Sequence, residues 1–171
     1  MPEAWLRGPI EGVDPYLMPA AHALVQAGEE IEQAVAGLTA EQVWARPGGA
    51  ASIGYHLRHV IGSLDRLLSY ARGASLDAHQ RAFLELESEP CDPPVPADSL
   101  LAGVRTAIEA ALRTYRGTPR ERLLETRVVG RAALPSNVLG LLFHSAEHTQ
   151  RHAGQVVTTA KVVREAVRTG G

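Results

Sequence analysis

Apolar residues recur at helical spacing in four long stretches of this chain, and no stretch alternates apolar and polar residues over a sustained length. This pattern constrains the fold more than any other feature, because such stretches bury one face each by packing together. We expect the first helix to start at Asp14-Pro15 and end at Gly37, and the second to run from Ser52 to Gly73. The third is expected from Asp98 to Gly117, and the fourth from Pro135 to about Arg168.

The segments between these helices are less regular. Residues 1–12 are expected to form an irregular arm, and Thr39 to Gln42 fits a capping box for a short helical turn. Residues 78–86 are compatible with a helix, and residues 126–129 with a short strand or an extended loop. We therefore predict one all-α domain over residues 1–171, an up-down-type four-helix bundle with long connections after helices 2 and 3.

Composition excludes several classes of function. The net charge of −2 gives no electrostatic reason to expect nucleic-acid binding. Cys91 is the sole cysteine, which rules out an intrachain disulfide and a thiolate cluster. The start of the chain lacks the pattern of a secretory signal, and no apolar run is long enough for a membrane span, so a cytoplasmic location is expected.

Histidines mark the candidate site. His144, His148 and His152 follow one another at four-residue spacing, so they form a stripe on one face of the fourth helix. His56 and His59 form a second pair on the second helix. Imidazoles on two helices can bind one divalent metal, and this pattern predicts a site between the helices. The helical wheel leaves open whether His56 or His59 faces that site.

Other histidine chemistries are not supported. None of the seven histidines follows a glutamate by three residues, as the di-iron bundle motif requires. Glu147 precedes His148, but the His-Glu-x-x-His order of a zincin is absent.

Three segments together resemble the DinB/YfiT-like superfamily of metal-binding four-helix bundles. They are residues 38–47 (LTAEQVWARP), residues 52–60 (SIGYHLRHV) and the final His148-x-x-x-His152-x-Gly154-Gln155. The resemblance implies that His59, His148 and His152 are the metal ligands, with zinc or nickel the expected ion. His56 and His144 then become residues that support the ligands or line a substrate pocket.

The same resemblance implies an enzyme that acts on a small-molecule substrate. Some members of the family are thiol S-transferases that use a low-molecular-weight thiol, and others are described as metal-dependent hydrolases, so a detoxification-type reaction is expected. Glu147 and Gln155 are candidates for orienting the ligands, and Arg127 and Arg131 for binding an anionic cofactor or substrate. A homodimer is plausible. The alternatives are a non-catalytic metal-binding protein, with a structural site or a sensor role, and a helical interaction module without metal.

Overall fold

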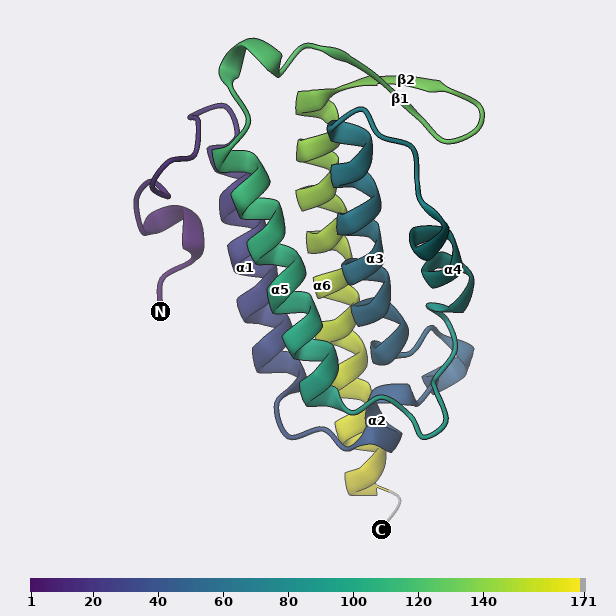
Figure 1. Ribbon diagram of the computed structural model, residues 1–171. Coiled ribbons are helices and arrows are strands. Elements are labelled where there is room, and N and C mark those ends of the chain that lie inside the picture. The colour runs from purple at the N-terminus through teal and green to yellow at the C-terminus, as the bar shows by residue number, and fades with distance from the viewer. Residues whose placement is uncertain (170–171) are drawn as a thin grey trace.

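Four long helices build the protein in the computed structural model, which describes the backbone of residues 1–169 and the side chains of residues 1–166 (Figure 1). They are α1 (Met18–Val35), α3 (Ile53–Ala71), α5 (Ala97–Arg116) and α6 (Val138–Thr169). Helix α6 packs against α1 and α3, and α5 packs against the same two helices on the other side. The prediction of an all-α four-helix bundle with long connections is confirmed.

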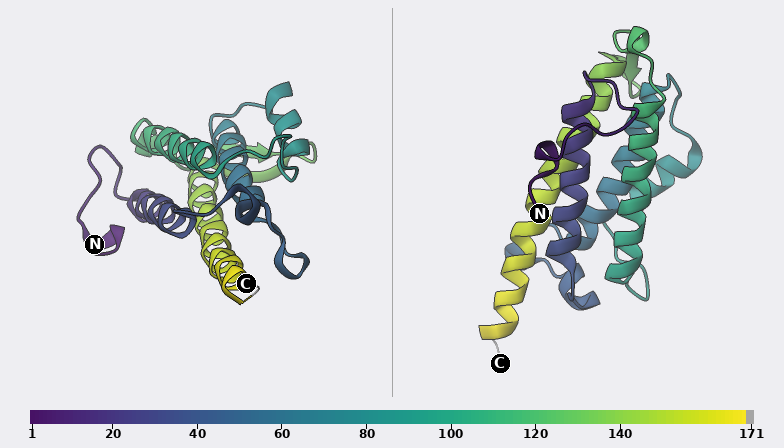
Figure 2. Two further views of the ribbon diagram at one scale, coloured as in Figure 1. Left: turned by 90° about the horizontal axis from the view of Figure 1, so that it is seen from below. Right: turned by 90° about the vertical axis from the view of Figure 1, so that its left-hand side faces the viewer.

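Short elements connect and flank the bundle. They are η1 (Ala4–Leu6), α2 (Ala40–Trp44), η2 (Pro47–Gly49), α4 (Ala78–Leu86), η3 (Arg120–Arg122), β1 (Thr126–Val129) and β2 (Leu134–Asn137). The two strands form an antiparallel hairpin. Seen along the bundle, the N-terminal arm lies outside α1 and α4 lies outside α3 (Figure 2, left). The expected helix at 78–86 and the expected strand at 126–129 are both present.

The direction of the helices differs from a simple up-down arrangement. Helices α1 and α6 run one way, and α3 and α5 both run the other way (Figure 1). The connection between α3 and α5 therefore has to return along the whole bundle, and it carries α4 on the way. A connection of this length permits parallel neighbours, whereas a short loop would have forced them to be antiparallel.

Side-chain caps fix where two of the helices begin. The Ser52 hydroxyl accepts a hydrogen bond from the Tyr55 N–H at 3.1 Å and starts α3, as expected. Thr39 and Gln42 form the reciprocal capping box that starts α2. Because these bonds satisfy backbone donors that the helix leaves open, they define the first residue of each helix and the rotation of its faces.

The first helix begins later than Asp14-Pro15 predicted. Asp14 instead stabilises a turn, since its carboxylate accepts a hydrogen bond from the Tyr16 N–H at 2.9 Å, and α1 starts at Met18. An aspartate before a proline suits such a turn as well as a helix start.

Two further helix starts are also corrected. Asp98 lies in the first turn of α5, whose N-cap is Pro96. Pro135 lies in β2, and α6 starts at Val138. Proline cannot donate a backbone hydrogen bond, which suits the edge strand of a two-stranded hairpin as well as the first turn of a helix.

Close packing at two places ties the connections to the bundle. Trp44 lies across Gly54, where an added Cβ would come within 2.7 Å of the indole ring, and its Nε1 donates to the Val95 carbonyl at 3.0 Å. Tyr115 is completely buried, and its hydroxyl donates to the Leu142 carbonyl at 2.6 Å. None of the helices in the described chain combines the length and apolarity that crossing a bilayer demands.

Candidate metal centre

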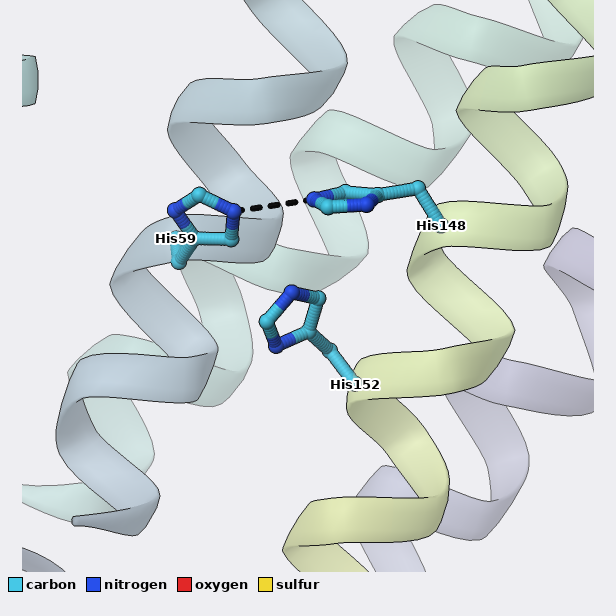
Figure 3. Close-up of side chains that lie close together, drawn as sticks. All are labelled: His59, His148 and His152. Carbon is cyan, nitrogen blue, oxygen red and sulfur yellow. Dashed lines mark hydrogen bonds between the residues drawn. The ribbon is translucent and has the colours of Figure 1, made fainter. Parts of the chain in front are cut away.

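Helices α3 and α6 bring three histidines together in the interior of the bundle. His59 comes from the middle of α3, and His148 and His152 come from successive turns of α6 (Figure 3). One ring nitrogen from each histidine lies within 4.8 Å of the corresponding nitrogens of the other two. The antiparallel crossing of the two helices makes this possible, because residues far apart in sequence face each other at mid-height.

A carboxylate determines how the His59 ring is oriented. Glu87 Oε1 lies 2.5 Å from His59 Nδ1, and Glu87 is only 4% exposed. A buried carboxylate accepts a hydrogen bond, so Nδ1 carries the proton and Nε2 presents its lone pair. That Nε2 lies 2.9 Å from His148 Nε2, toward the middle of the cluster (Figure 3).

The rings of His152 and His148 complete the cluster. His152 Nδ1 lies 2.9 Å from His56 Nδ1, which leaves Nε2 of His152 as its donor atom toward the other two rings (Figure 3). His148 Nδ1 is buried and has no hydrogen-bond partner among the described residues. Tyr55 stacks on His59 with ring centroids 5.5 Å apart and covers one side of the cluster.

The protonation of the imidazoles favours cation binding. Burial, and then the charge of His59, lower the pKa of His56 and His148 to about 4 each. Burial and the same neighbour lower the pKa of His152 to about 3. These rings are therefore neutral at pH 7, and a neutral imidazole is the form that binds a metal.

The chemistry of the three donors and the spacing of one pair of them fit a divalent metal ion. Two nitrogens that share an ion at about 2.0–2.1 Å lie about 2.9–3.4 Å apart, depending on the bond angle. The 2.9 Å between His59 Nε2 and His148 Nε2 falls in this range. An ion would also accept lone pairs that otherwise face one another, so these three histidines could hold a metal.

Glu87 and Arg66 are site residues that the sequence did not reveal. Glu87 caps the C-terminus of α4, and its second oxygen accepts a hydrogen bond from Arg66 Nη1 at 3.2 Å. Burial alone would raise the pKa of Glu87, but the His59 hydrogen bond and the Arg66 charge outweigh it and hold the pKa low. The carboxylate is therefore ionised, which strengthens its hold on the His59 proton.

No sequence signal singles out Glu87. It stands among Glu85 and Glu89, both exposed, in a segment without clear periodicity. Only the three-dimensional path of residues 72–96 turns this one glutamate toward α3.

The other candidate residues lie in different places. His56 is buried beside His152, in a supporting position. The His144 side chain is 49% exposed and contacts Glu147, which also pairs with Arg151 on the outer face of α6. Gln155 is exposed on the same helix.

The two arginines expected to bind an anion are on the hairpin. Arg127 donates to the Ala71 carbonyl at 2.8 Å and to Glu125 at 2.7 Å, and so holds the hairpin to the end of α3. Arg131 is exposed in the turn between the strands. The structure does not bring either arginine into contact with the three histidines.

A comparison with known protein families identifies the family of the chain. The family model of the DinB superfamily matches residues 23–156, which include both histidine-bearing helix segments. The chain therefore belongs to the DinB superfamily. A separate comparison with curated proteins found no match.

Proposed function

For this member of the DinB superfamily, we propose a metal-dependent enzyme that activates a thiol or water nucleophile toward a small-molecule electrophile. The observation that carries the proposal is the three-histidine cluster with its buried Glu87. The described residues offer three nitrogen donors to the centre, fewer than the four ligands that close a structural zinc site. A metal with an open position lowers the pKa of a bound thiol or water.

The surrounding residues support this role in specific ways. Glu87 holds the His59 proton on Nδ1 and keeps Nε2 directed at the centre. His56 contacts the far nitrogen of His152 and restricts rotation of that ring. Tyr55 covers the cluster on one side, while the His59 side chain keeps 16% of its surface exposed. These contacts hold the rings in place and shield one side of the centre, and His59 keeps a small exposed surface there.

Zinc and nickel are among the metals that suit neutral imidazole donors, and we propose one of them as the ion and a low-molecular-weight thiol as the co-substrate. In an S-transfer reaction the thiol sulfur forms a bond to an electrophilic carbon, and the leaving group departs with its bonding electron pair. The thiol proton passes to solvent. In the hydrolytic version, the oxygen of water replaces the thiol sulfur.

Metal content is the first test. Protein purified without a nickel column and analysed by elemental analysis should contain a divalent metal at near one equivalent per chain. Single replacement of His59, His148 or His152 by alanine should remove most of it, whereas His144→Ala should retain it, because His144 is an exposed member of the same stripe. Equal metal content in all four variants would refute the assignment.

Activity is tested on the metal-loaded protein. Different low-molecular-weight thiols are incubated with electrophilic acceptors, and thiol consumption and product mass are recorded. We expect turnover that is lost in His152→Ala. A fully loaded protein that neither consumes any thiol nor hydrolyses activated esters or amides would contradict the enzymatic proposal.

A further inference from the structure

A pocket lies between α3, α4 and α5, and none of the three histidines lines it. Its volume is about 420 Å³, within the range of small-molecule sites. Most of the wall is apolar, and it includes Ile61, Leu68, Phe83, Ala107 and Ala110. Exposed polar side chains on the three helices mark its opening; they are Asp65, Arg72, His79 and Thr106.

Glycines on two helices shape the walls of this pocket. A Cβ at Gly103 of α5 would lie 2.7 Å from the Ile61 side chain. A Cβ at Gly62 of α3 would lie 2.8 Å from the Phe83 ring and 2.6 Å from Arg66 Nη1. The missing side chain at Gly62 lets Phe83 and Arg66 lie close against α3, and the aromatic ring forms part of the wall.

The positive and negative side chains around the pocket sum to a net charge of zero. Asp65 accepts a hydrogen bond from Gln80 at 2.9 Å, and Arg66 donates to Glu87 at 3.2 Å. Arg72 lies at the opening, so the groups are two positive and two negative when Glu87, which pairs with Arg66 from outside the wall, is counted. A charged ligand would add an uncompensated charge to a partly enclosed site beside Arg66, which costs free energy, whereas a neutral ligand would not.

Arg66 supplies a polar contact point inside the pocket. It is only 8% exposed, it belongs to the pocket wall, and within the described chain its guanidinium makes one hydrogen bond, to Glu87. A guanidinium carries five N–H donors, so several remain for a ligand. A carbonyl or amide oxygen can accept from them without adding charge.

We propose that this pocket binds a small uncharged molecule with a ring-sized apolar body and one oxygen acceptor directed at Arg66. The body would lie against Phe83 and the alanines of α5, where burial of apolar surface supplies most of the binding free energy. This proposal does not depend on the metal centre and is independent of the proposed function. Arg66 is nevertheless shared, because it also holds the glutamate that orients His59.

Matched probes test the chemistry of the ligand. The probes are 4-phenylbutanamide, 4-phenylbutanoate and 4-phenylbutylamine. They share a phenylalkyl body; the carboxylate differs from the amide in charge, and the amine differs in charge and also lacks the oxygen acceptor. Binding to the full-length protein is measured by titration calorimetry, with and without bound metal. We expect saturable binding of the amide, and binding of both charged probes at least about 10-fold weaker, which corresponds to about 1.4 kcal/mol.

Two variants of α5 test the location. Ala107→Leu fills the pocket and should weaken amide binding at least about 10-fold. Ala102→Leu is the matched control, because Ala102 is an exposed residue of the same helix outside the pocket wall, and its affinity should stay unchanged. Circular dichroism and thermal melting verify that both variants fold.

A third measurement needs no variant. The chain has two phenylalanines, Phe83 in the pocket wall and Phe143 exposed on α6. In NMR spectra of protein labelled at phenylalanine, adding 4-phenylbutanamide should shift the signals of Phe83 and leave those of Phe143 unchanged.

Three results would overturn the proposal: no Phe83 response at saturating amide, tighter binding of either charged probe, or wild-type affinity in folded Ala107→Leu. A Phe83 shift that depends on protein concentration alone would also overturn it, by assigning the pocket to a second copy of the chain.

Discussion

Glutamine in place of Glu87 removes the negative charge next to His59 while keeping the size of the side chain. In the native protein, the Glu87 carboxylate accepts hydrogen bonds from His59 Nδ1 at 2.5 Å and from Arg66 Nη1 at 3.2 Å, and Glu87 is 4% exposed. Hydrogen bonds to a charged group contribute about 1.5–3 kcal/mol and neutral ones about 1 kcal/mol. Loss of such an outer partner typically lowers metal affinity about 10–100-fold, or about 1.4–2.7 kcal/mol.

The assay is a competition titration of metal-stripped Glu87→Gln protein with zinc against a chromogenic chelator. Glu85→Gln is the matched control, because it makes the same change in charge two residues away on the exposed surface of α4. We expect Kd to rise about 10–100-fold in Glu87→Gln and to stay constant in the control. Wild-type affinity in a folded Glu87→Gln protein would refute the reasoning that this carboxylate tunes His59.

Three further predictions concern stability. In the folded state the pKa is about 4 for His148 and about 3 for His152, so below about pH 6.5 the unfolded chain binds protons at these residues that the folded chain does not bind. The metal-free protein should therefore lose stability as pH falls from 6.5 toward 4. A Tm that stays constant between pH 7 and pH 4.5 would contradict this. Gly54→Ala places a methyl group 2.7 Å from Trp44 and should cost about 1–3 kcal/mol, measured by urea unfolding, and wild-type stability would show that the indole moves freely. Tyr115→Phe removes a buried hydroxyl that has two partners and should cost about 1–2 kcal/mol in the same assay; wild-type stability would show that the hydrogen bond from Ser145 to the Leu142 carbonyl suffices without it.

Much of the fold could be predicted from the sequence because helix signals are local. The Ser52 cap and the Thr39 capping box bond to residues three positions away, so their effect is visible in a short window. Pro135 was misassigned because proline suits both an edge strand and a first helical turn, and only pairing with Val128 distinguishes them.

The candidate site was predictable only in part. The spacing of His148 and His152 indicates one helical face, but the wheel did not decide between His56 and His59, and only the family resemblance favoured His59. In the structure both rings face α6, one in the cluster and one behind it. The role of Glu87 could not be predicted from the sequence, because its burial depends on how the long connection between α3 and α5 crosses α3.

The source of Glu87 has a consequence for how such a centre can diversify. The three nitrogens belong to helices whose other faces form the core, so moving them would disturb the packing of the whole bundle. The carboxylate belongs to the connection between α3 and α5, residues 72–96, most of which are exposed. Exchanging that connection for another of equal span would change the basicity of one imidazole while the scaffold stays intact, which makes it the natural segment to randomise when engineering new reactivity.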